Sequence, residues 1–390
     1  MRTGSFIIFL SIFFSIYSLS NIFIYFVIRK LFNLKGIKRL ILKISHILIA
    51  SLYISSRFIE NYWRNSLTES LAAIGSFYLA VMLYLFLLSL TGVIIWFILK
   101  RFSNAAILTN KHKDKTLKYA GIFMVMFVSV ITIYGYHHAC SPQVKYHKIS
   151  ISKSQFSSPL RIAFVSDIHL GTIIKNKRLN KMVTSVNSFS PDIILLGGDI
   201  VDEDIAPVIK YDMGALLTKL NAPLGVFGVT GNHEYIGGVE KAVKYLEDHN
   251  ITMLRDKAII IPGRLILIGR EDFSITRFTS KARLPLSEII NNQISPSDWT
   301  QLPSIIVDHQ PYGINEAITQ KADFMMSGHT HNGQLWPIKY IVSQIFKIRH
   351  GLKKFEDTWF LVSSGYGTWG PPVRVATDSE IIIIDLFPEN

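Results

Sequence analysis

The fold of the C-terminal part of the chain is decided by residues 160–169, Leu-Arg-Ile-Ala-Phe-Val-Ser-Asp-Ile-His, where a short apolar run ends in Asp167 and His169. Short apolar runs of this kind predict buried strands, and the amphipathic stretches between them predict helices. Alternating strands and helices indicate an α/β domain with helices outside its sheets. The expected strands are 162–165, 193–196, 225–229, 265–268, 304–307, 324–326, 359–362 and 381–384, and the expected helices are 177–189, 211–220 and 239–249.

Polar clusters follow five of these expected strands. Ligands in α/β proteins collect at the carboxyl ends of strands, so five clusters in such places could converge on one site. The clusters are Asp167 with His169, Gly197-Gly198-Asp199, Gly231-Asn232-His233-Glu234, Asp308-His309, and Gly328-His329-Thr330-His331.

The side chains in these clusters have the chemistry of metal ligands. Carboxylate oxygens and imidazole nitrogens suit Mn, Fe and Zn. Two cations about 3.5–4 Å apart need a carboxylate between them, and together they polarise a phosphoryl group and lower the pKa of a shared water. The i, i+2 spacing within Asp-x-His and His-x-His points both side chains of each pair the same way. Leaving His233 aside, the candidate ligands are Asp167, His169, Asp199, Asn232, His309, His329 and His331.

The series Asp167-x-His169, Gly198-Asp199, Gly231-Asn232-His233-Glu234, His309 and Gly328-His329-x-His331 resembles the calcineurin-like metallophosphoesterase superfamily. The resemblance covers about residues 160–387. It implies a four-layer α/β/β/α sandwich with a dinuclear metal site between the two sheets. By position, it implies a first metal held by Asp167, His169, Asp199 and His331, and a second held by Asn232, His309 and His329, with Asp199 bridging. It also implies that the catalytic residue His233 contacts the phosphoryl oxygen or protonates the leaving group.

The segment 364–374, Ser-Gly-Tyr-Gly-Thr-Trp-Gly-Pro-Pro-Val-Arg, looks like the membrane-anchored bacterial branch of phosphodiesterase-like members. Two features depart from relatives, which often have glycine at Asn332 and a less charged turn at 270–272. Arg374 is a candidate substrate ligand, because a guanidinium can bind phosphate through two hydrogen bonds. A surface ion pair is the alternative role for this arginine.

The N-terminal part has the composition of a membrane domain. Apolar residues make up 49% of the chain, and mean hydropathy is +0.30. The runs 5–28, 71–99 and 119–136 are apolar enough to span a bilayer, which takes about 20 residues. The segment 40–55 is weaker, because it contains Lys43 and His46.

Charge predicts the topology of this part. Residues 1–144 hold 15 Lys and Arg against 3 Asp and Glu, whereas residues 145–390 hold 26 against 25. The basic excess lies between apolar runs, so it indicates cytoplasmic loops, and no nucleic-acid binding is expected. The basic stretches 29–43 and 100–118 can both be cytoplasmic only if 40–55 crosses the membrane. Four spans then place both termini and the catalytic domain outside the bacterial cytoplasmic membrane.

These features predict three parts: a membrane domain at 1–140 with about four transmembrane helices, a linker at 141–158, and a catalytic domain at 159–390. Residues 335–354 mix aromatic, aliphatic and basic side chains, so they are expected to form a helix lying in a membrane interface or packing on the domain core. The expected function is a membrane-anchored phosphohydrolase that cleaves a phosphodiester or pyrophosphate bond in a lipid or envelope substrate. The alternatives are a cytoplasm-facing UDP-2,3-diacylglucosamine-type pyrophosphatase and a non-catalytic membrane sensor.

Overall fold

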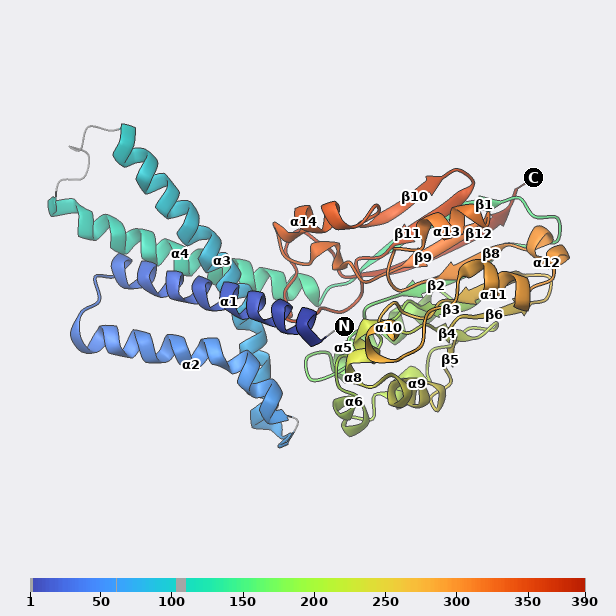
Figure 1. The fold of residues 1–390 in the computed structure, drawn as a ribbon, viewed down its shortest axis with the longest axis horizontal. Coiled ribbons are helices and arrows are strands. Elements are labelled where there is room, and N and C mark those ends of the chain that lie inside the picture. Colours follow the sequence, from blue (N-terminus) through green and yellow to red (C-terminus); the bar gives the residue numbers. More distant parts are fainter. Residues whose placement is uncertain (1–2, 61, 103–109, 390) are drawn as a thin grey trace. The chain divides into compact units, whose positions relative to one another are not determined.

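The computed structural model describes residues 3–60, 62–102 and 110–389, which divide into two units (Figure 1). The first unit comprises residues 1–137 with 370–373, and the second comprises residues 138–369 with 374–390. Four long helices begin the chain: α1 (Thr3–Leu31), α2 (Gly36–Glu60), α3 (Ser66–Phe102) and α4 (Asn110–Ala139).

Three of these helices contain segments that are long and apolar enough to cross a membrane, judged by length and composition within the described residues. The segments are Ser11–Leu31, Ser66–Arg101 and Asp114–Ala139, and they match the expected runs at 5–28, 71–99 and 119–136. The weaker segment 40–55 is helical throughout as part of α2, but its composition does not reach the same standard. Its crossing of the membrane stays a prediction.

Helices α1, α2 and α3 pack against one another through polar groups and one glycine. Nε2 of His46 lies 3.0 Å from the backbone oxygen of Asn21 in α1. Tyr78 in α3 donates a hydrogen bond to the side chain of the same Asn21. A Cβ at Gly75 would lie 2.5 Å from the backbone nitrogen of Tyr53, so only glycine lets α3 approach α2 this closely. His46 therefore serves helix packing here.

The second unit contains two six-stranded sheets. In the first sheet the strand order is β1-β12-β2-β3-β4-β5, and in the second it is β10-β11-β9-β8-β7-β6. The bounds in the first sheet are β1 (Gln143–Ile151), β12 (Glu380–Pro388), β2 (Leu160–Val165), β3 (Ile193–Leu196), β4 (Val226–Gly228) and β5 (Thr252–Met253). Those in the second are β10 (Gly351–Phe355), β11 (Thr358–Val362), β9 (Phe324–Ser327), β8 (Ser304–Val307), β7 (Leu265–Gly269) and β6 (Lys257–Ile261).

The alternation of side chains along each strand builds the layers. In β2, Ile162 and Phe164 lie in the core between the two sheets, with strands β7, β8 and β9 opposite. Ala163 and Val165 face the other way, under α5 (Asn176–Ser188) and α9 (Val239–Glu247). Helix α5 fits this face because its buried residues Leu179, Met182, Val183 and Val186 recur with helical spacing.

On the outer face of the second sheet, α11 (Leu286–Gln293) and α13 (Ile314–Thr319) cover β7 and β8. The four-layer α/β/β/α sandwich is thus confirmed (Figure 1). The remaining α-helices are short: α6 (Ala206–Lys210), α7 (Gly214–Leu217), α8 (Asn232–Gly237), α10 (Ile275–Phe278), α12 (Pro296–Gln301) and α14 (Ile338–Ile345).

Three expectations about local structure need correction. The expected linker at 141–158 contains β1, which pairs in parallel with the last strand, β12, so this segment is part of the first sheet. The helix expected at 211–220 is only the single turn α7. The segment 335–354 is not one helix: α14 covers its middle, and the edge strand β10 begins at Gly351.

Candidate metal centre

The candidate ligands lie on loops that leave the carboxyl ends of their strands. Asp167 and His169 follow β2, Asp199 follows β3, Asn232 opens α8 after β4, His309 follows β8, and His329 and His331 follow β9. Strand order places β2, β3 and β4 side by side in one sheet and β8 and β9 side by side in the other. Five of these residues have positive φ, which is uncommon outside glycine and concentrates at functional sites. They are Asp167 (52°), His169 (53°), Asp199 (48°), His329 (69°) and His331 (46°).

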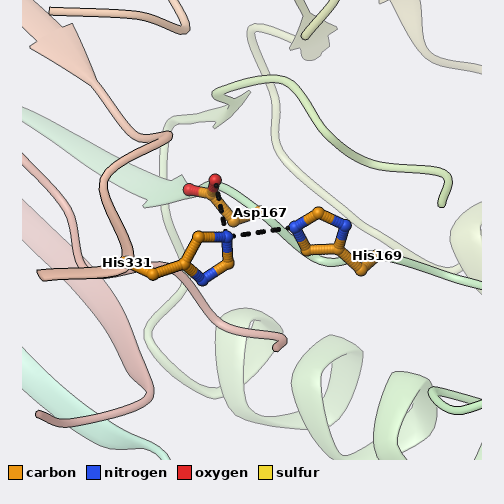
Figure 2. Close-up of side chains that lie close together, drawn as sticks. All are labelled: Asp167, His169 and His331. Atoms are coloured by element: carbon orange, nitrogen blue, oxygen red, sulfur yellow. Dashed lines mark hydrogen bonds and ion pairs between the residues drawn. The ribbon is translucent and has the colours of Figure 1, made fainter. Parts of the chain in front are cut away.

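Asp167, His169 and His331 form the first ligand group, and all three are buried. Nε2 of His331 lies 3.4 Å from Oδ1 of Asp167 and 3.1 Å from Nε2 of His169. Figure 2 shows this ring nitrogen facing both the carboxylate and the His169 ring. Two imidazole nitrogens and a carboxylate oxygen therefore converge on one point.

Asp199, His309 and His329 form another group. Nε2 of His309 lies 3.2 Å from Oδ2 of Asp199 and 3.3 Å from Nδ1 of His329. Nδ1 of His309 lies 2.8 Å from the carbonyl oxygen of Gly197, which can only accept, so Nδ1 carries the proton and Nε2 is directed at the ligand group. Asp199 also forms a third group with His169 and His233, so its carboxylate is shared between the groups.

These residues fit a pair of divalent cations. Within each group the ligand atoms all lie within 4.8 Å of one another. Oδ1 of Asn232 is buried and has no hydrogen-bond partner among the described residues, as expected of an oxygen reserved for a metal. Six of the seven predicted ligands fall into these groups, and the seventh, Asn232, adjoins His233.

The electrostatics favour the metal-binding forms of His329, His331 and Asp199. Burial lowers the pKa of His309, but Asp199 outweighs it and holds that pKa well above the ordinary value, and burial raises the pKa of Asp167. Burial, together with the charge of His309, lowers the pKa of His329 to about 3. Burial and the neighbouring His169 hold the pKa of His331 well below its usual value. Burial raises the pKa of Asp199, but His309 and His233 outweigh it and hold that pKa well below the ordinary value. Neutral imidazoles and an ionised carboxylate are the protonation states that a cation requires.

Glycines and a buried glutamate shape the loops under the ligands. A Cβ at Gly231 would collide with the Asp199 carboxylate, and one at Gly328 would collide with that of Asp167, so both positions need glycine. Glu234 accepts hydrogen bonds from the backbone N–H groups of Asp199 (3.1 Å), Val201 (2.8 Å) and Gly231 (2.7 Å). Its carboxylate thereby joins the loops after β3 and β4. Burial, together with the charge of Asp199, raises the pKa of Glu234 to about 7.

His233, a member of the third group, is held by Asp202. Its Nδ1 is 3.0 Å from Oδ1 of Asp202, and the same oxygen is 3.5 Å from Nδ1 of His169. Burial lowers the pKa of His233, but Asp199 and Asp202 outweigh it and raise this pKa to about 9. Sequence reasoning missed Asp202. Its only signal was its place three residues after Asp199 in the same strand-end loop.

Arg374 has a structural role that differs from the expected one. Its side chain is completely buried, and its Nη2 donates to the carbonyl oxygens of Ser364 (2.6 Å) and Gly367 (2.7 Å). Nη2 also lies 3.3 Å from Nδ1 of His331, and Nη1 donates to the carbonyl oxygen of Asp378. The guanidinium therefore supports a candidate ligand and the 364–367 loop, which corrects its assignment as a substrate ligand.

The charged turn 270–272 is also structural. Arg270 is buried, and its Nη1 lies 2.9 Å from Glu316. Glu271 accepts a hydrogen bond from Thr230 at 2.6 Å, and Asp272 accepts one from Gln310 at 2.9 Å. This turn therefore braces the loops that carry Asn232 and His309.

Comparison with known proteins identifies the family. Residues 160–333 match the model described as "Calcineurin-like phosphoesterase". An "Uncharacterized metallophosphoesterase" of Aquifex aeolicus is 30% identical, over 67% of this chain and 98% of its own length. The chain belongs to the calcineurin-like metallophosphoesterase family. It is therefore a metal-dependent phosphoesterase with its ligand groups intact.

Two other relatives of this metallophosphoesterase are informative. An "Uncharacterized metallophosphoesterase" of Helicobacter pylori is 32% identical over 65% of this chain, which spans 66% of that relative's length. A Danio rerio protein named "Transmembrane protein with metallophosphoesterase domain" is 29% identical over 68% of this chain and 62% of its own length. This relative and the three apolar helices both point to membrane association.

Proposed function

We propose that this metallophosphoesterase uses two divalent ions, Mn, Fe or Zn, to cleave a phosphodiester or pyrophosphate bond in a phosphorylated lipid or envelope substrate. The observation that carries the proposal is the set of three overlapping ligand groups, in which His169 links the first group to the third and Asp199 links the third to the group of His309 and His329. Two ions bound there would polarise a phosphoryl group and lower the pKa of a water molecule. The same complete set of ligands argues against a non-catalytic sensor.

His233 supplies the proton chemistry. With a pKa of about 9, its imidazolium form persists at neutral pH and can donate a proton to the leaving-group oxygen. The ionised Asp202 holds the ring through Nδ1, which leaves Nε2 as the donor to substrate. The ring of Trp369, which is half exposed, lies 6.3 Å from that of His233 and supplies an apolar wall beside it.

The membrane segments support a lipid or envelope substrate, and charge supports an extracytoplasmic catalytic domain. One structural observation favours the alternative, a cytoplasm-facing UDP-2,3-diacylglucosamine-type pyrophosphatase. Helix α2 falls short of the composition of a spanning segment, and if it does not cross, the basic stretches 29–43 and 100–118 lie on opposite sides. The catalytic domain could then face the cytoplasm.

Hydrolysis by the purified full-length chain tests the enzyme assignment. We expect metal-dependent release of nitrophenol from bis(p-nitrophenyl) phosphate, and loss of that activity in His331→Ala. Equal activity in the variant at matched metal content would refute the site. Reporters active on only one side of the membrane, fused after residue 390, separate the substrate classes. A cytoplasmic signal would make the nucleotide-lipid pyrophosphatase the leading function.

A further inference from the structure

An exposed apolar segment lies on the catalytic unit at α14. None of the eight residues of α14, all of them described, is buried. Tyr340, Ile341 and Ile345 are each 58–62% exposed, and Trp336, just before the helix, is also exposed. Apolar residues gathered in this way on one element mark an interaction surface.

A basic pocket adjoins this helix. It has a volume of about 220 Å³ and is lined by Ser343, Phe346, Lys347, Arg349, His350 and Lys353. The segment 335–354 contains five Lys and Arg residues and no Asp or Glu. The pocket is therefore suited to an anion that carries a phosphate.

The pocket is held in shape by hydrogen bonds. Nη1 of Arg349 donates to Oγ of Ser343 at 2.8 Å and to the backbone oxygen of Lys339 at 3.2 Å, which fixes the guanidinium against α14. Nε2 of His350 lies 3.2 Å from Oε2 of Glu380. That carboxylate also accepts hydrogen bonds from Ser363 and Ser364, which share its charge.

The surface around α14 continues to the rim of the metal centre. The Phe346 ring lies 5.8 Å from the ring of His329 and 5.1 Å from that of Tyr312. The carbonyl oxygen of Arg349 accepts a hydrogen bond from Thr330, which stands between His329 and His331. A molecule bound along α14 would therefore lie next to the catalytic site.

We propose that α14 and the basic pocket bind an anionic phospholipid of the bilayer, with its phosphate in the pocket and its acyl chains against Tyr340, Ile341 and Ile345. Aromatic and aliphatic side chains beside Lys and Arg are the composition of membrane-interface segments. Free phosphate would satisfy the pocket but leave the apolar helix in water, so the combination favours a lipid. This binding is distinct from hydrolysis and goes beyond the proposed function.

Fluorescence quenching in nanodiscs tests the proposal with the full-length chain. The native thiol is removed by Cys140→Ser, and an environment-sensitive fluorophore is placed at Ile341→Cys. A matched probe at Ser297→Cys lies in α12, at the end of the catalytic unit away from α14 (Figure 1). We expect spin-labelled lipid to quench the Ile341 probe several-fold more when phosphatidylglycerol is present than in phosphatidylcholine alone. The Ser297 probe should not respond.

Charge reversal in the double variant Lys347→Glu/Lys353→Glu should abolish the response to phosphatidylglycerol. The double variant Ile341→Ser/Ile345→Ser should weaken lipid binding, which is measured with the fluorophore placed at Tyr340→Cys instead. Equal quenching at both probe sites, or quenching that ignores phosphatidylglycerol or the charge reversal, would overturn the proposal. Displacement by inorganic phosphate at the concentration of the lipid would assign the pocket to a soluble anion instead. Metal-dependent hydrolysis of bis(p-nitrophenyl) phosphate, measured on the same variants, shows that they are folded and keeps this result separate from the proposed catalysis.

Discussion

Replacing Asp202 with asparagine tests whether His233 acts as an acid. The two residues lie 3.0 Å apart, and the pKa of Asp202 is held well below its ordinary value because His169 and His233 outweigh its burial. Asparagine has nearly the same shape but no charge, so the pKa of His233 should fall from about 9. Substituting a residue that orients a catalytic or ligand histidine typically lowers metal affinity or activity by about 10–100-fold. We therefore expect kcat/KM to fall by about 10–100-fold, or roughly 1.4–2.7 kcal/mol.

The pH profile gives this prediction its sign. If imidazolium is the active form, activity is lost as pH rises through the pKa of His233, so a lower pKa moves the alkaline limb to lower pH. The assay is kcat/KM for bis(p-nitrophenyl) phosphate across pH, with bound metal quantified in the same samples. Asp212→Asn is the matched control, because Asp212 lies on an exposed turn away from the ligand groups.

A double-mutant cycle with His233→Ala decides how Asp202 acts. If Asp202 acts through His233, Asp202→Asn should lower kcat/KM little further in the His233→Ala background. A further tenfold loss in that background would mean that Asp202 acts through His169 and the metal. An unchanged rate and pH profile in the single variant would refute the reasoning altogether.

Three further predictions concern the metal centre and its support. Asp199→Asn should reduce the amount of bound metal and lower kcat/KM by more than the roughly 10–100-fold typical of a residue that only orients a ligand. Full turnover at matched metal content would contradict the shared position of Asp199. Chelation should lower Tm, since a ligand at 100 times its Kd stabilises the folded state by about 2.7 kcal/mol, and scanning fluorimetry with and without Mn²⁺ measures it; an unchanged Tm would argue against metal binding to the folded chain. Arg374→Met should lower the free energy of unfolding by about 3 kcal/mol, because it leaves the carbonyl groups of Ser364, Gly367 and Asp378 without their donor. KM for a soluble diester should stay unchanged, and a raised KM with unchanged stability would return Arg374 to the substrate site.

The sequence predicted the inner strands well because each is a continuous apolar run. The observed bounds of β3 and β8 coincide with the expected ones, 193–196 and 304–307. Edge strands were missed for a physical reason: β1 contains Lys145, His147 and Lys148, and β10 contains Lys353 and Lys354, so no apolar run marks either strand. Strand β1 becomes recognisable only through its partner β12, more than 200 residues away.

The candidate ligands were predictable because each stands directly at a strand end, where chain position implies place in space. Asp202 and Glu234 were not, because their roles depend on contacts between separate loops. Glu234 reaches Asp199 from 35 residues away, and Asp202 reaches His233 from the loop after the preceding strand. The exposure of α14 also could not be predicted from the sequence, because an amphipathic pattern does not indicate whether the apolar side packs on a core or stays exposed.

The position of β12 in the first sheet affects how the protein is made. Strand β12 lies between β1 and β2 in this sheet, so neither can pair with it until residues 380–388 have been synthesised. Glu380, at its start, accepts from the backbone N–H of Ser364 and donates its own N–H to Gly365, which packs against Asp167. The catalytic loops therefore reach their final form only after residues 380–388 have been synthesised. A chain truncated before residue 380 would expose the edges of β1 and β2 and lose a support of its metal centre, a state that quality-control proteases recognise.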